Sequence, residues 1–141
     1  MNNKNNTNGA MMEYYLKATY QKSYYKKAKV FMDDDFIVLR SYDTDVIAID
    51  REKNKIIRLW NGWSKTTSIH INDFLKQNGF STLNKKEWLA MECINPEPVY
   101  NMYYSTGFYT HKSNILLTEQ EAEQEYNRIS ENNPRLTVWY E

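Results

Sequence analysis

The pattern of apolar and polar positions is most regular between residues 56 and 80, where it predicts a strand, a turn and a helix in succession. β-Branched and aromatic residues fill positions 56–60, as is typical of a strand. The dipeptide Asn61-Gly62 accepts positive φ angles and predicts a tight turn, after which Trp63 resumes the apolar positions. Apolar side chains then recur at helical spacing, which predicts a helix over about 67–78.

Both ends of this predicted helix carry signals in the sequence. The hydroxyls of Thr66 and Thr67 can accept hydrogen bonds from the first free backbone N–H groups. Gly79 readily adopts the left-handed conformation that ends helices, and Leu75 and Phe80 occupy the positions of the hydrophobic contact in a Schellman motif. The whole structural motif comprises Trp60, Asn61, Gly62, Trp63, Thr66, Thr67, His70 and Gly79.

The residues before this motif predict an antiparallel meander. Apolar runs at 30–32 and 36–39 flank three aspartates, which predicts a hairpin with an acidic turn. A second turn at 41–44 leads into a strand at 46–49. We expect the strands of this meander to bury one face against the predicted helix.

Residues 13–29 have no clean period. Leu16, Ala18 and Tyr20 alternate with polar residues as a half-buried strand would. Residues 24–28 could form a helical turn before the next strand. The sequence therefore places a strand near 16–20 and leaves the following residues open.

The second half of the chain predicts short elements first. Asn84 or Thr82 can cap a short helix that contains Trp88. Residues 99–109 alternate as a strand does, and Gly107 lies in a break in that alternation. We therefore expect a short helix followed by an interrupted strand.

A longer helix is predicted near the carboxyl end. Thr118 and Glu121 form a capping box, which predicts a helix over 119–131. Alternation at 136–140 predicts a final strand. The side chains expected to pack inward from this helix are Ala122, Tyr126 and Ile129.

These elements predict an α+β fold, in which an antiparallel meander packs against the central helix at about 67–78 and the C-terminal helix and strand are appended. At 141 residues the chain has the length of one domain. Its first residues are rich in asparagine, which predicts a disordered tail. We expect a tail at 1–12, the core of a single domain at 13–92 and a C-terminal extension of that domain at 93–141.

Charge and cysteine content narrow the classes of function. The 18 Lys+Arg balance 18 Asp+Glu, which argues against a histone-like polycation or an acidic DNA mimic. Six of the lysines lie in residues 1–30, whereas eight of the acids lie in residues 91–141. A single Cys93 excludes an internal disulfide and a multi-thiolate zinc site, and it favours a reducing compartment. With no apolar run of spanning length, we expect a cytoplasmic protein that does not enter a membrane.

His70 is the first candidate for acid–base chemistry, because Thr66, Thr67 and Asp73 lie near it in the sequence. We favour the alternative that His70 is a boundary residue hydrogen-bonded to a neighbouring strand. The aspartates at 33–35 lack the glycine and the ligand spacing of a calcium loop. The sequence has no glycine-rich phosphate loop, paired histidines or nucleophile motif. We therefore expect no enzymatic activity, no metal site and no cofactor.

Tyrosine is abundant, with 12 residues, and its ring offers a large contact area at low entropic cost. Segment 17–29 mixes such rings with lysines. Cations that meet phosphates and rings that stack on unpaired bases are what a single-stranded nucleic acid requires, although lysines on the water face of a strand have the same pattern. The candidate partner- or nucleic-acid-binding residues are Lys17, Tyr20, Lys22, Tyr24, Tyr25, Lys26, Lys27 and Lys29.

The stretches SYDTDVIAID and WSKTTSIHINDFLKQNGF, with the preceding SYYKKAKV, resemble an uncharacterised domain of small bacteriophage and prophage proteins. The resemblance covers roughly residues 17–92 and brings no activity and no catalytic residues. It implies a phage context, in which small accessory proteins often bind host proteins or nucleic acid.

We therefore expect a non-enzymatic accessory protein of a phage or mobile element in the host cytoplasm. Its partner would be a host protein or a protein–nucleic-acid complex, and its action would be to inhibit antiviral defence in the manner of an anti-CRISPR protein. The second hypothesis is single-stranded nucleic-acid binding by segment 17–29. The third is an enzyme with His70 as acid or base. The sequence also allows the protein to form a homodimer.

Overall fold

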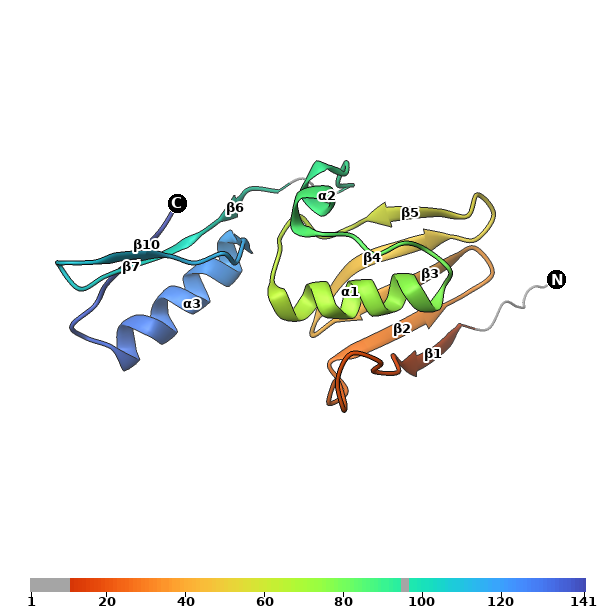
Figure 1. Ribbon diagram of the computed structural model, residues 1–141, viewed down its shortest axis with the longest axis horizontal. Helices are drawn as coiled ribbons and strands as arrows, with labels where there is room; N and C mark the ends of the chain where they lie inside the picture. Colours follow the sequence, from red (N-terminus) through yellow and green to blue (C-terminus); the bar gives the residue numbers. More distant parts are fainter. Residues whose placement is uncertain (1–10, 95–96) are drawn as a thin grey trace. The chain divides into compact units, whose positions relative to one another are not determined.

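The structure is a computed structural model that describes residues 11–94 and 97–141. The α+β fold is confirmed, with a five-stranded antiparallel meander, helices and smaller sheets nearer the carboxyl end (Figure 1). The described residues fall into two compact units. Unit 1 holds those up to Trp60 and from Thr66 to Ile94, and unit 2 holds Asn61–Lys65 and those from Glu97 onward.

Unit 1 is the meander with two helices. Strands that are neighbours in the sequence are neighbours in the sheet, in the order β1-β2-β3-β4-β5, and α1 runs along one face (Figure 1). The strands are β1 (Met12–Tyr15), β2 (Ala28–Met32), β3 (Phe36–Ser41), β4 (Thr44–Asp50) and β5 (Lys55–Arg58). The helices are α1 (Lys65–Gln77) and α2 (Lys85–Ala90).

The core of unit 1 follows from the register of its central strands. Val30 lies opposite Leu39, and Leu39 lies opposite Ile47, so these three side chains form a row across the sheet. All three are fully buried, as are Phe74 and Leu75 of α1. Burying such side chains removes apolar surface from water, and this is the main force that holds helix and sheet together.

The predicted hairpins of the meander are confirmed. Between β2 and β3, Asp33 Oδ1 accepts hydrogen bonds from the N–H groups of Asp35 and Phe36, each at 2.8 Å. Between β3 and β4, Tyr42 turns the chain with φ 55°. The first turn is therefore fixed by an aspartate side chain that bonds its own backbone.

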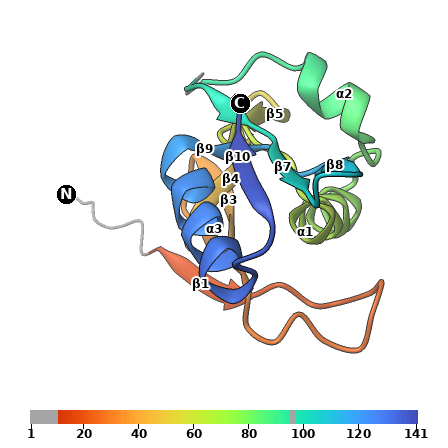
Figure 2. The same cartoon turned by 90° about the vertical axis from the view of Figure 1, so that its left-hand side faces the viewer.

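The strand predicted near 16–20 is wrong, and so is the helical turn at 24–28. Residues 16–27 form a long connection between β1 and β2, in which Tyr25 and Lys26 have φ 51° and 62°. Figure 2 shows this connection swinging out from the end of β1. It leaves the sheet because it is hydrogen-bonded to α1, as described below.

β1 lies at the edge of the sheet, ahead of this connection. Met12, which the sequence placed in the tail, pairs with Met32 of β2. The rest of the predicted tail, apart from Met11, lies outside the described residues. In the part of the chain that is described, no helix is long and apolar enough to cross a membrane.

The end of α1 is as predicted, but its start is not. Gly79 has φ 82°, its N–H donates to Lys76 O at 3.2 Å, and the N–H of Phe80 donates to Leu75 O at 2.9 Å. These two bonds are those of a Schellman motif, which confirms the predicted stop. The helix begins at Lys65, so the prediction that Thr66 and Thr67 cap it from outside is wrong.

The tight turn predicted at Asn61-Gly62 is also wrong. Neither residue has positive φ, and neither lies in a turn. The backbone instead continues to Trp63, whose N–H donates to Leu116 O at 3.2 Å and whose carbonyl accepts from Leu116 N at 2.8 Å. This reciprocal bridge takes the place of the hairpin that the dipeptide favours.

α2 is capped as predicted and is held by a buried arginine. Asn84 and Glu87 form a capping box at its start. Arg58 of β5 lies 5.0 Å from the ring centroid of Trp88 and donates to the carbonyls of Trp60 at 2.9 Å and Met91 at 3.0 Å. Burial removes most of the water around Arg58 and lowers its pKa. The carbonyls and the ring stabilise the charge in place of that water.

Unit 2 packs one helix against small sheets. β7 (Met102–Ser105) is the central strand between β10 (Thr137–Tyr140) and β8 (Thr110–Lys112). β6 (Val99–Tyr100) pairs with β9 (Leu117–Thr118), which leads directly into α3 (Glu119–Asn132). The buried core consists of Met102, Ala122, Ile129 and Val138.

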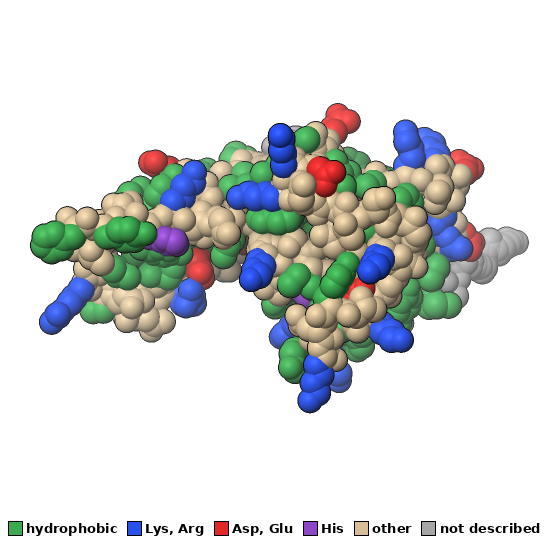
Figure 3. All heavy atoms as spheres, in the orientation of Figure 1, with side chains coloured by type: hydrophobic (Ala, Val, Ile, Leu, Met, Phe, Trp, Pro, Cys, Tyr) green, Lys and Arg blue, Asp and Glu red, His purple; other side chains and the backbone are tan. Residues whose placement is uncertain are grey.

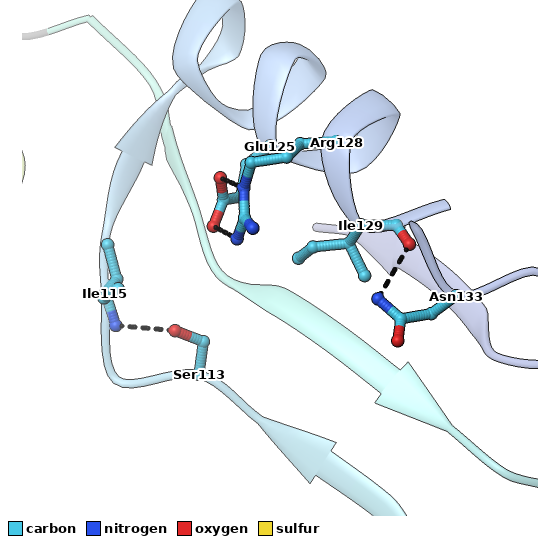
Figure 4. A network of polar contacts seen from close by, with 6 residues as sticks. All are labelled: Ser113, Ile115, Glu125, Arg128, Ile129 and Asn133. Atoms are coloured by element: carbon cyan, nitrogen blue, oxygen red, sulfur yellow. Dashed lines mark hydrogen bonds and ion pairs between the residues drawn. The ribbon is translucent and has the colours of Figure 1, made fainter. Parts of the chain in front are cut away.

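Local contacts fix both ends of α3, and its capping box at Thr118 and Glu121 is confirmed. Asn133 Nδ2 donates to Ile129 O at 3.1 Å at the other end, and Arg128 makes two bonds to Glu125 (Figure 4). Ala122 and Ile129 point inward as predicted, whereas the prediction for Tyr126 is wrong because it is exposed.

Gly79 gives a test of the helix stop. We expect Gly79→Ala to lower the free energy of unfolding by about 1–2 kcal/mol, because a Cβ disfavours left-handed backbone. A Cβ there would meet no atom within 4 Å, so the loss comes from the backbone alone. Gly79→Asn should lose less, since asparagine tolerates this conformation. Equal losses in urea titrations of the two variants would contradict this account.

Candidate functional site

A buried carboxylate holds the β1–β2 connection against α1. Asp73 of α1 is 0% exposed. Its Oδ2 accepts from Thr19 N at 2.8 Å and from the Tyr24 hydroxyl at 2.6 Å, and its Oδ1 accepts from the Thr19 hydroxyl and from Gln77 Nε2 at 2.9 Å. Gln77 Nε2 also donates to Lys17 O at 2.8 Å. The connection is thus bonded to the helix at three of its residues.

These hydrogen bonds keep Asp73 ionised in the interior. Burial raises the pKa of Asp73, but the bonds from Thr19, Tyr24 and Gln77 together outweigh burial and leave the pKa below its usual value. The pKa of Tyr24 is raised by its own burial and by the same bond to Asp73. A carboxylate paired in this way requires the connection to stay in place, because losing a donor leaves a buried charge short of partners.

A second polar cluster joins the same helix to β3. His70 Nδ1 lies 2.8 Å from Ser41 Oγ, which lies 3.0 Å from Thr67 Oγ1. All three side chains are buried, and the Tyr24 ring meets the His70 ring edge-on at 4.7 Å. The prediction that His70 is hydrogen-bonded to a neighbouring strand is confirmed, whereas its predicted place at the boundary of the core is wrong because its side chain is buried. Thr67 is a partner of that strand rather than a helix cap.

Apart from the buried Leu16 and Tyr24, most side chains of the connection face water. We call these side chains, with those that adjoin them from β1, β2, the β3–β4 turn and α1, the basic aromatic surface. Figure 3 shows Lys or Arg and hydrophobic side chains interspersed over this connection, at the bottom of the view. The surface comprises Tyr15, Lys17, Tyr20, Lys22, Tyr25, Lys26, Lys27, Lys29, Tyr42 and Lys76.

The fold brings rings and ammonium groups together across this surface. The ammonium groups of Lys26 and Lys29 lie 5.9 and 5.6 Å from the centroid of the Tyr15 ring. Lys27 lies 6.0 Å from the Tyr42 ring, and its carbonyl accepts from Tyr42 N at 2.7 Å. These are cation–π separations, so each ring already has a positive charge beside it.

A third such pair is formed by the connection and the helix, where Lys76 lies 5.6 Å from the Tyr20 ring. Carboxylates are scarce at these lysines. Lys29 forms an ion pair with Glu13 at 3.2 Å. Within the described residues, no ion pair involves Lys17, Lys22, Lys26, Lys27 or Lys76. The surface is therefore positively charged and aromatic.

Of the eight residues that the sequence singled out, six are exposed and Lys29 is half-buried. Tyr24 is the exception: at 4% exposure it belongs to the core, and its place on a contact surface is a wrong prediction. The sequence analysis missed Tyr15, Tyr42 and Lys76. The turn predicted around Tyr42 could have indicated that this side chain is exposed. No signal in the sequence places Tyr15 or Lys76 beside the connection, because tertiary packing brings them there.

Comparison with known proteins identifies the domain but not its activity. The model of a family of unknown function (DUF8033) matches residues 14–90, more than half of the chain. The match confirms the part of the resemblance that concerns an uncharacterised domain. No curated protein and no solved structure matches the chain.

The bond from Tyr24 to Asp73 gives a second prediction. Tyr24→Phe should lower the free energy of unfolding by about 1.5–3 kcal/mol, because it removes a donor from a buried charge. Tyr25→Phe removes the hydroxyl of an exposed neighbour and should change stability by less than about 0.5 kcal/mol. If both variants unfold at the same urea concentration as the wild type, the bond to Asp73 does not stabilise the fold.

His70 predicts a pH dependence. Burial lowers its pKa, and the charge of Asp73 only partly offsets this. The unfolded chain then binds a proton at His70 below about pH 6.5 while the folded chain does not, so stability should fall as the pH drops below that value. Urea titrations between pH 7.5 and 5.0 should show this loss in the wild type and a weaker one in His70→Asn. A loss of stability that is unchanged in His70→Asn would contradict the assignment.

Proposed function

We propose a function for this chain, which belongs to the DUF8033 family of unknown function, from its basic aromatic surface: it is a non-enzymatic protein that binds a host macromolecule. The observation that carries the proposal concerns the β1–β2 connection, which is rich in lysine and tyrosine. It exposes most of these side chains to water and is hydrogen-bonded to α1. A surface held in place before binding loses little entropy when a partner arrives.

The resemblance to small phage and prophage proteins supports a proposal for the origin and role of the protein. We propose that the chain is an accessory protein of a phage or mobile element that inhibits an antiviral defence complex in the host cytoplasm, as anti-CRISPR proteins do. Such complexes are assemblies of protein and nucleic acid, and a basic aromatic surface suits either component.

The position of His70 supports binding rather than catalysis. The ring is 2% exposed, and its Nδ1 bonds to Ser41 in the interior of unit 1. A general acid or base must reach the substrate proton directly or through one water molecule. Thr67 instead bonds Ser41 of β3, and Asp73 accepts hydrogen bonds from the β1–β2 connection.

Affinity capture from a bacterial host lysate tests this function. We expect the wild type to retain a defined partner, and Lys26→Ala/Lys27→Ala to lose most of it. The matched control is Lys53→Ala/Lys55→Ala, which removes two exposed lysines from the opposite end of the same sheet and should retain the partner. Capture that is the same with both double variants, or turnover of a small molecule that depends on His70, would contradict the proposal.

A further inference from the structure

We infer that the basic aromatic surface binds a single strand of nucleic acid. This inference rests on the proposed function and names the partner class of that same surface. It also extends the site beyond segment 17–29, because Tyr15, Tyr42 and Lys76 join it through the fold. The strand would be the nucleic-acid component of the host complex that the protein engages.

Each of three ring-and-ammonium groupings offers the two kinds of chemical group that can bind one nucleotide. Tyr15 lies beside Lys26 and Lys29, Tyr42 beside Lys27, and Tyr20 beside Lys76, with ammonium-to-centroid distances of 5.6–6.0 Å. A strand repeats a flat base and a negative phosphate at every nucleotide. Each grouping can thus offer a ring to a base and a cation to the adjacent phosphate.

The exposure of the rings favours a single strand over a duplex. Tyr25 is 71% exposed, Tyr42 51%, Tyr15 50% and Tyr20 47%. Stacking on such rings requires the faces of unpaired bases, which a duplex hides within its own stack. These rings project from a loop, a turn and an edge strand, and stacking on them needs no particular base sequence.

The charge pattern favours a polyanion over an ordinary protein surface. Lys17, Lys22, Lys26, Lys27 and Lys76 form no ion pair with any described residue. Phosphates along a strand can meet several of these cations and release their own counterions, which drives binding at low salt. An acidic peptide could meet the same cations, but its carboxylates would not stack on the exposed rings.

The hydrogen bonds to Asp73 and Gln77 hold the basic aromatic surface in place before a ligand binds. Thr19 and Tyr24 are tied to Asp73, and Lys17 is tied to Gln77, so the backbone of the connection is fixed where its side chains emerge. A single strand loses conformational freedom when it binds, and a surface that is already ordered adds little further cost. The Asp73 carboxylate itself lies below the surface, where donors from the connection and α1 occupy both of its oxygens.

Fluorescence anisotropy with labelled oligo-dT and oligo-U, titrated over a range of salt concentrations, tests the inference on the full chain. The wild type should bind both strands at low salt and bind a mixed-sequence duplex more weakly. Lys26→Gln/Lys27→Gln should lower the slope of log affinity against log salt by about 1.4, at about 0.7 for each lost phosphate contact. Lys53→Gln/Lys55→Gln, at the other end of the sheet, should leave slope and affinity unchanged.

The tyrosines test a separate contribution. Tyr20→Leu and Tyr25→Leu should each weaken binding about 5- to 150-fold if a base stacks there, with the salt slope unchanged, because a ring releases no counterion. Tyr20→Phe and Tyr25→Phe keep the ring and should bind like the wild type. Urea titrations establish that each variant is folded, so a loss of affinity cannot come from a loss of structure.

Three outcomes would overturn the inference. One is no anisotropy change with either strand at low salt, and another is equal affinity for the duplex. The third is binding of a poly-glutamate peptide as tight as that of oligo-dT, with no effect of the tyrosine variants. If capture from a nuclease-treated lysate still depended on Lys26 and Lys27, the proposed function would stand and its partner would be a protein.

Discussion

The carboxylate of Asp73 lies wholly inside unit 1, where an ionised group is costly unless hydrogen bonds replace the water it has lost. Uncharged donors from Thr19, Tyr24 and Gln77 do so here. Two of these residues lie on the β1–β2 connection and one lies on α1, so a single anion joins two elements that are distant in the sequence. The exposed side chains of the connection owe their positions to this buried charge.

The polar interior also explains why the connection needs no regular structure of its own. Its backbone is long, and its residues make few hydrogen bonds to one another. Side chains of α1 supply bonds in their place, and Leu16 and Tyr24 supply buried apolar contact. The connection is thus a folded loop, held at fixed points, and the side chains between those points are free to meet a partner.

Much of the fold could be predicted from the sequence because its signals are local. The Thr118–Glu121 and Asn84–Glu87 capping boxes act within one helical turn, and the Gly79 stop depends on the backbone of a few residues. The same holds for the aspartate turn between β2 and β3. Such interactions involve only neighbouring residues, so they can be predicted without knowledge of distant parts of the chain.

The errors have distant causes. Asn61-Gly62 favours a turn, but Trp63 is drawn into a bridge with Leu116. The residues next to Tyr24 in the sequence are typical of a protein surface, but its hydroxyl donates a hydrogen bond to Asp73, 49 positions away. The lysines of the candidate site could be placed on the surface from charge alone. The tyrosines could not be sorted in this way, because a tyrosine suits both a core and a contact surface and only the partner of its hydroxyl decides.

The bridge between Trp63 and Leu116 has a consequence for synthesis of the chain on the ribosome. Trp63 emerges long before Leu116, and at about 5–20 residues per second the interval between them lasts several seconds. During that time the backbone groups of Trp63 have no strand to pair with, while the Asn61-Gly62 dipeptide beside it still favours a reversal. The reciprocal bridge that positions Trp63 can therefore form only after Leu116 has been translated.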